Sequence, residues 1–181
     1  MKYLIALLLL LGSFNLFADN KYFEKYKGKT VVLEWLNHGC PFVRKHYDSG
    51  NMPALQKEFT AKGVVWLSVI SSAPGEQGHS DAKKAQEEKL KYKSAASEII
   101  LDESGEIGRH YGAKTTPHMY IINPQGELVY QGAIDSIADT NHDSIAKAEP
   151  WFKNALNETL SGKKVKRPTT KAYGCSVKYK D

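Results

Sequence analysis

The sequence predicts an α/β domain in which a central sheet is covered by helices on both faces. Two apolar, β-rich segments, 30–36 and 63–70, have the pattern of strands that are buried on both sides. A helical segment lies between them, which gives a strand–helix–strand crossover with parallel strands. Turn residues at 123–126 then separate two further strands and predict an antiparallel hairpin. We therefore expect a mixed sheet.

The remaining elements follow from periodicity and breaking residues. A helix starts over 42–47 and is interrupted at 48–51, and a second helix then has Pro53 in its first turn. The charged segment 81–97 predicts an exposed helix, and 104–111 a short helix closed by Gly112. Strands are expected at 99–101, 118–122 and 127–131. A final helix is expected over 144–160, with a kink at Pro150 or a true start near residue 149.

Composition limits the class of protein. The chain has 181 residues, of which 41% are hydrophobic and 25% charged, as in one globular domain. Two cysteines are too few for a disulfide-dense scaffold or a four-thiolate zinc site. The formal net charge of +5 comes from the C-terminal tail, residues 163–181, because residues 19–162 carry −2. Nucleic acid is therefore not an expected partner.

The chain ends differ from the body. Residues 1–18 contain a basic start and the apolar run 4–11, which is too short to span a bilayer and is typical of a signal peptide. A retained N-terminal anchor is the alternative. We expect cleavage before Asp19, a domain over 19–162, a basic tail over 163–181, and a periplasmic or secreted protein without membrane contact after cleavage.

Cys40 is the first candidate for chemistry. It follows a predicted buried strand, and Pro41 begins the helix that comes next. The dipole and free N–H groups at a helix N-terminus stabilise a thiolate, so we expect a reactive thiol; a buried structural cysteine is the alternative. Glu34 lies six residues earlier on the buried strand, where its pKa should be raised into a range that suits a proton carrier. A surface carboxylate on an edge strand is the alternative for Glu34.

These residues carry a resemblance to a known family. An acid six residues before a Cys-Pro helix start, a Thr-Pro before a hairpin and a final helix resemble the thioredoxin fold. The segments 34–43, 111–117 and 173–179 are similar to the exported peroxiredoxin-like branch (alkyl hydroperoxide reductase/thiol-specific antioxidant, or redoxin). The resemblance implies a thioredoxin-like mixed sheet and a cis Pro117 against the active thiol. It also implies that the backbone of Thr116 docks a partner's cysteine strand.

Two departures from the family pattern bear on the reaction. Thioredoxins carry a second cysteine three residues after the first, where this chain has Val43. Peroxiredoxins bind peroxide through a threonine three residues before the cysteine, where this chain has Asn37. Asn37 could donate a hydrogen bond in its place. The resemblance thus leaves two classes of partner open: a peroxide, or a disulfide of a protein or small molecule. It implies no cofactor. Asn37, His38, Pro41, Thr116 and Pro117 are expected to support the site.

Cys175 is the second thiol, and two interpretations of it stay open. As a resolving cysteine it would attack an oxidised Cys40, helped by Lys178 and Lys180, which should lower its pKa. As a structural cysteine it would form a permanent disulfide with Cys40, which would stabilise the fold by on the order of 5 kcal/mol. The protein would then be a redox-inert binding module. A third interpretation is a metal carrier that uses Cys40 with His38, His46 or His118. We expect no metal at the site.

Overall fold

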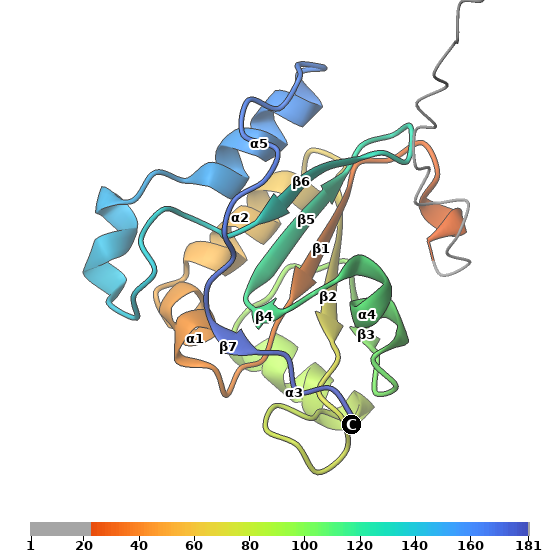
Figure 1. Ribbon diagram of the computed structural model, residues 1–181, viewed down its shortest axis with the longest axis vertical. Helices are drawn as coiled ribbons and strands as arrows, with labels where there is room; N and C mark the ends of the chain where they lie inside the picture. Colours follow the sequence, from red (N-terminus) through yellow and green to blue (C-terminus); the bar gives the residue numbers. More distant parts are fainter. Residues whose placement is uncertain (1–22, 181) are drawn as a thin grey trace, which may run out of the picture.

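A five-stranded mixed sheet forms the centre of the protein, which we describe from a computed structural model for residues 23–180 (Figure 1). The order of the strands is β3-β2-β1-β5-β6, with β1, β2 and β3 parallel and β5 and β6 antiparallel to their neighbours. The strands are β1 (Val31–Trp35), β2 (Val65–Ile70), β3 (Glu98–Leu101), β5 (His118–Ile122) and β6 (Leu128–Gly132). The predicted mixed sheet is confirmed.

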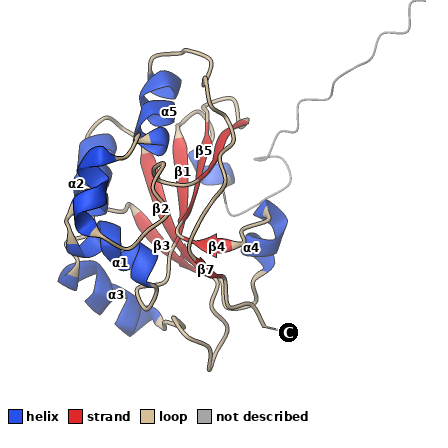
Figure 2. Ribbon diagram, turned by 60° about the vertical axis from the view of Figure 1, so that its left-hand side comes forward, coloured by secondary structure: helices blue, strands red, loops and turns tan. Residues whose placement is uncertain are grey.

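Helices cover both faces of this sheet (Figure 2). The helices are α1 (Pro41–Asp48), α2 (Asn51–Thr60), α3 (Ala82–Lys91), α4 (Glu106–Tyr111) and α5 (Trp151–Leu160), with short 3₁₀ turns η1 (Glu24–Tyr26) and η2 (His142–Lys147). α1, α2, α3 and α5 lie on one face, and α4 lies on the other. This arrangement confirms the predicted α/β fold with helices on both sides.

Strand β1 shows why the sheet needs both layers. Val31, Leu33 and Trp35 point into the core on the α4 side, and Val32 points into the core beneath α1, α2 and α5. All five residues of β1 are buried, as the apolar pattern predicts. Burying a large apolar side chain stabilises the fold by about 1.5–3 kcal/mol. β1 is therefore a central strand and carries the site at its carboxyl end.

Some boundaries differ from the predictions for local reasons. The last helix begins at Trp151 with Pro150 before it, and 142–147 form the separate turn η2, so the later of the two predicted starts is correct. The helix predicted over 81–97 ends at Lys91, and Lys93 has a left-handed backbone with φ of 53°. Gly50, with φ of 77°, precedes α2 and produces the predicted break after α1.

The C-terminal tail is more structured than the sequence indicates (Figure 1). Val165 is buried in the core, the N–H of Thr170 donates to the carbonyl oxygen of Gln131 in β6, and the N–H of Gln131 donates to the carbonyl oxygen of Pro168. Further on, β7 (Cys175–Ser176) pairs antiparallel with β4 (Thr115–Thr116). The tail therefore contributes a buried side chain and a strand to the folded domain. Within residues 23–180, no helix is long and apolar enough to cross a membrane. The predicted signal peptide, 1–18, lies outside the described residues.

Candidate active site

Cys40 lies at the N-terminus of α1, directly after the loop that leaves β1. It is the N-cap residue, and Pro41 is the first residue of the helix, where its missing N–H costs nothing. The Cys40 side chain is fully buried, and its Sγ donates to the carbonyl oxygen of Thr116 at 3.1 Å. The Thr116–Pro117 peptide bond is cis. The structure thus brings together Cys40, Pro41, Thr116 and Pro117, which the sequence places in two distant segments.

Cys175 reaches the same place from the tail. In the small β4–β7 sheet it is the direct partner of Thr116, the residue whose carbonyl oxygen contacts Cys40. Gly174 allows this close approach, because a Cβ at that position would lie 2.1 Å from the Thr116 oxygen. Both cysteines are free thiols. Two thiols that are 135 residues apart in the chain therefore share one site.

The two thiols differ in acidity. Burial raises the pKa of Cys40, but hydrogen bonds from the Cys175 thiol and from the N–H groups of Val43, Cys175 and Phe42 outweigh it. The pKa of Cys40 is therefore below the ordinary value of 9.0. Burial, followed by the hydrogen bond and charge of Cys40, raises the pKa of Cys175 to about 11. The predicted lowering of this pKa by nearby lysines is wrong, because the effect of Lys178 is outweighed. Cys40 is therefore the more acidic thiol of the pair.

Glu34 is fully buried in the middle of β1, so the alternative of a surface carboxylate on an edge strand is wrong. Its oxygens accept hydrogen bonds from Tyr47 Oη at 2.8 Å and Trp66 Nε1 at 2.7 Å. Gln56 Nε2 donates at 3.0 Å and Ser68 Oγ at 3.4 Å. Burial nevertheless raises the pKa of Glu34, as predicted. Its carboxylate is held by the core and has no hydrogen bond to Cys40 among the described contacts.

Asn37 and His38 shape the loop before Cys40. The Asn37 Oδ1 accepts from the N–H of Gly39 at 2.8 Å, and its Nδ2 donates to the carbonyl oxygen of Gln77 at 3.1 Å. The amide therefore holds the loop through its oxygen and one of its two N–H groups, and the expected hydrogen bond to a peroxide stays a prediction. The His38 ring stacks on Tyr92 with centroids 4.3 Å apart. Burial lowers the pKa of His38 to about 4, so the ring is neutral at pH 7.

The other candidate histidines are dispersed. The His118 ring packs on Tyr120, with centroids 4.5 Å apart, and Tyr120 Oη lies 3.2 Å from His118 Nδ1. His46 bonds to Asn51 and Tyr173 on the inner side of α1. Among residues 23–180 there is no group of three or more His, Cys, Asp and Glu side chains that could hold a metal ion.

Sequence reasoning missed the partners that hold Glu34. Tyr47, Gln56 and Trp66 come from α1, α2 and β2, and the sequence analysis predicts no polar role for them. One signal was present, because Gln56 lies on the same buried helical face as Met52 and Phe59. A buried polar residue in an apolar stripe needs a partner.

Comparison with known proteins places the chain in a family. Residues 15–131 match the AhpC/TSA family. The structure resembles a hypothetical protein from Sinorhizobium meliloti, with a TM-score of 0.72 and 18% identity over 87% of this chain and 83% of that one. It also resembles an uncharacterized conserved protein from Geobacillus kaustophilus, with a TM-score of 0.69 and 22% identity over 84% and 78% of the two chains.

A more distant likeness points to the same fold. A putative protein disulfide isomerase from Bacteroides thetaiotaomicron matches with a TM-score of 0.53 and 14% identity, covering 76% of this chain and 77% of that one. No curated protein sequence matches the chain significantly. The family match spans well over half of the chain and includes Cys40. The chain therefore belongs to the AhpC/TSA family and is a thioredoxin-fold thiol oxidoreductase.

Proposed function

We propose that the protein is an exported thiol–disulfide oxidoreductase in which Cys40 is the nucleophile and Cys175 the resolving thiol. The observation that carries this proposal is the position of Cys175 opposite Thr116, whose carbonyl oxygen accepts from Cys40. The opposite pKa shifts of the two thiols support the assignment of roles. A thiolate attacks a disulfide, whereas a thiol of high pKa stays protonated until the attack is complete.

The proposed reaction has two balanced steps. The Cys40 thiolate attacks one sulfur of a substrate disulfide, forms a mixed disulfide and releases the first thiolate. Cys175 then loses its proton and attacks the Cys40 sulfur, which forms the Cys40–Cys175 disulfide and releases the second substrate thiol. The substrate is reduced by two electrons and the cysteine pair is oxidised by two. The reverse sequence oxidises a substrate dithiol.

A disulfide substrate is favoured over a peroxide because Asn37, which replaces the threonine of the peroxiredoxin pattern, uses its amide to hold the loop. Its Oδ1 accepts from Gly39 and one of its two Nδ2 hydrogens is donated to Gln77, which leaves at most one N–H for a peroxide. A disulfide needs no such donor, because its leaving thiolate is stabilised by its own low basicity and by protonation. The partner is therefore proposed to be a protein or small-molecule disulfide, with peroxide as the comparison substrate in the test.

Glu34 and His38 have proposed supporting roles. Glu34 is proposed as a proton carrier, and its burial, its raised pKa and its place on the Cys40 side of the sheet support this role. His38 and Pro41 are proposed to fix the loop and the helix start that present Cys40. The ring of His38 meets Tyr47, a donor to Glu34, edge to face at 4.7 Å. Thr116 and Pro117 are proposed to support Cys40 from the opposite side.

The test uses oxidised glutathione and mass spectrometry after acid quenching. Wild type is expected to form an intramolecular disulfide, and Cys175→Ser to accumulate a glutathione adduct on Cys40. Cys40→Ser is expected to lose both products. If Cys175→Ser gives no adduct and both single mutants lose several kcal/mol of stability equally, the pair is a staple and the protein is a binding module. Faster reaction with peroxide than with glutathione disulfide would reassign the substrate.

Export is a separate part of the proposal, motivated by the apolar run 4–11. A protein that acts on disulfides outside the cytosol would keep its oxidised form there. Mass spectrometry of the protein expressed in its native host is expected to find Asp19 or a close neighbour at the N-terminus of a periplasmic or secreted form. An intact Met1 on cytosolic protein would contradict export.

A further inference from the structure

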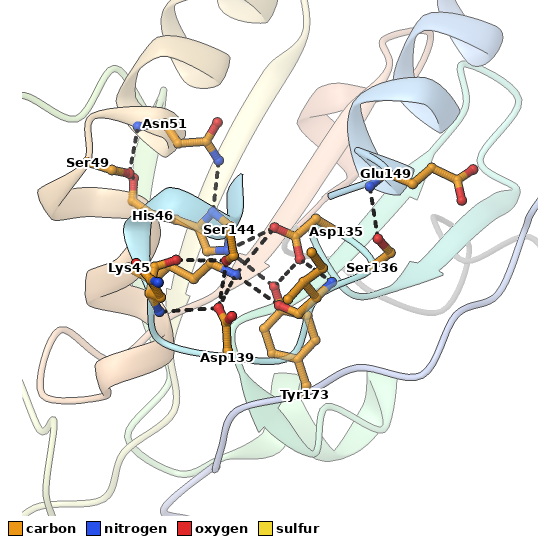
Figure 3. Close-up of polar contacts among 12 residues, drawn as sticks. Lys45, His46, Ser49, Asn51, Asp135, Ser136, Asp139, Ser144, Glu149 and Tyr173 are labelled. Atoms are coloured by element: carbon orange, nitrogen blue, oxygen red, sulfur yellow. Dashed lines mark hydrogen bonds and ion pairs between the residues drawn. The ribbon is translucent and has the colours of Figure 1, made fainter. Parts of the chain in front are cut away.

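A polar cluster between α1, the segment after β6 and the tail has no part in the proposed chemistry (Figure 3), and its members Lys45, His46 and Asp135 are buried. It consists of Lys45 and His46 on α1, Asp135 and Asp139 in the segment after β6, and Tyr173 in the tail. The Lys45 side chain is fully buried, and its Nζ lies 3.0 Å from Asp139 Oδ1 and 3.6 Å from Asp135 Oδ2. It also donates to the carbonyl oxygen of Ile137 at 2.9 Å. A buried ammonium of this kind is tolerated only with such partners.

The hydroxyl of Tyr173 joins this cluster to the tail. It donates to Asp135 Oδ1 at 2.6 Å and lies 3.3 Å from His46 Nε2. Asn51 Nδ2 donates to His46 Nδ1 at 2.8 Å, so the proton of the neutral ring is on Nε2 and points to Tyr173. The hydroxyl therefore accepts one hydrogen bond and donates another. A phenylalanine at this position would keep the ring and lose both bonds.

Tyr173 is two residues from Cys175. Two extended residues span about 7 Å, so fixing the Tyr173 hydroxyl leaves the position of Cys175 little freedom. The Tyr173 ring also packs against Phe42, with centroids 5.8 Å apart, and Phe42 is two residues after Cys40. The contacts of Tyr173 with Phe42 and His46 therefore connect the tail segment that carries Cys175 to α1, the helix that begins after Cys40.

We propose that Tyr173, held by Asp135 and His46, is a positioning residue that keeps Cys175 at high effective concentration beside Cys40. This inference rests on the proposed function. The step that it assists is the second one: the sulfur of Cys175 bonds to that of Cys40, the mixed-disulfide bond breaks, and the leaving thiolate takes the proton that Cys175 gives up. Tyr173 touches neither reacting sulfur in this account and acts only through the position of the tail.

The test follows the two steps separately with Ellman's reagent and the full-length reduced protein. Attack by Cys40 releases one equivalent of thionitrobenzoate, and attack by Cys175 on the mixed disulfide releases a second. Cys175→Ser should show only the first release, and its rate therefore gives the rate of attack by Cys40. In Tyr173→Phe the second release is expected to slow by about tenfold or more, because the effective concentration falls. The first release should be no slower than in wild type.

A matched control removes a similar hydrogen bond elsewhere. Tyr26 donates to Glu98 Oε2 at 2.5 Å beside β3, the edge strand opposite β6, and Tyr26→Phe should leave both releases at wild-type rates. Equal second-phase rates in Tyr173→Phe and wild type would overturn the inference, as would parallel slowing of both phases. A wild type that shows no second release would instead overturn the resolving role of Cys175. Circular dichroism of each variant confirms that it is folded.

Discussion

Cys175 is the strand partner of Thr116, and the carbonyl oxygen of Thr116 accepts from the thiol of Cys40. A tail of the same chain therefore lies over the nucleophile, which is fully buried. We expect a substrate to reach Cys40 only when this segment moves aside. In the proposed reaction the tail would then supply the resolving thiol and also control access to the nucleophile.

Removal of the Cys175 thiol should raise the pKa of Cys40. The hydrogen bond from Cys175 is the largest influence that lowers this pKa, and burial opposes it. Cys175→Ala removes the donor, so the pH at which half of Cys40 is a thiolate should rise. Cys175→Ser keeps an O–H donor, so the rise should be smaller. Thiolate absorbance in the ultraviolet, followed against pH, measures both. A midpoint unchanged in Cys175→Ala would show that the two thiols do not interact.

Gly174→Ala should detach the tail from β4. Gly174 has φ of 136°, and a Cβ there would lie 2.1 Å from the Thr116 oxygen, so the strand pairing has to open. Alkylation of Cys40 in the reduced protein should then be faster by about tenfold. Gly162→Ala is the matched control, because Gly162 also has a positive φ, 66°, but has open space around its Cβ. Equal alkylation rates in the two variants would contradict a covering role for the tail.

Glu34→Gln should slow turnover more than it weakens substrate binding. Burial raises the pKa of Glu34, so its carboxyl takes up and releases a proton more readily at higher pH than an ordinary carboxyl, and an amide cannot do so; we expect a loss of about a hundredfold in rate over pH 6–8. Glu87→Gln on the exposed face of α3 serves as the control. Retention of the wild-type rate and pH profile by Glu34→Gln would reduce Glu34 to a structural role.

Stability should fall as the pH is lowered from 6.5 toward 4. Burial lowers the pKa values of His38, His46 and His118 to about 4 in the folded protein. Between about pH 4 and pH 6.5 the unfolded chain binds protons that the folded chain does not. Each histidine therefore lowers the free energy of unfolding by up to about 1.4 kcal/mol for each pH unit of acidification. Urea unfolding at several pH values measures this slope, and NMR titration of the three rings identifies its source. A flat profile over this window would contradict neutral, buried rings.

The sequence predicted the layers of the fold because its signals are local. The buried strands β1 and β2, the break before α2 and the hairpin of β5 and β6 each follow from the residues within them. The helix start at Cys40 and the burial and raised pKa of Glu34 were predicted from the surrounding residues, and the cis Pro117 was implied by the family resemblance. The proximity of Cys175 to Cys40 is confirmed, but the contacts that produce it were not predicted.

Those contacts depend on side chains that meet only after folding. β4 and β7 have two residues each, which is too short for a strand pattern to be visible. Tyr173 and Asp135 are 38 residues apart, and nothing in their local sequence connects them. Gln56 was visible as a polar residue on an apolar face, but its partner Glu34 was not. Long-range pairing of this kind is set by packing rather than by periodicity.

The redox potential of the Cys40–Cys175 pair tests the central claim most directly. It is measured by equilibration with glutathione or dithiothreitol buffers, acid quenching, alkylation of free thiols and mass spectrometry. A pair that exchanges disulfides in turnover should have a potential within about −120 to −270 mV, the range of known exchange enzymes. A potential below about −300 mV would contradict the account, because such a disulfide resists reduction and acts as a structural staple.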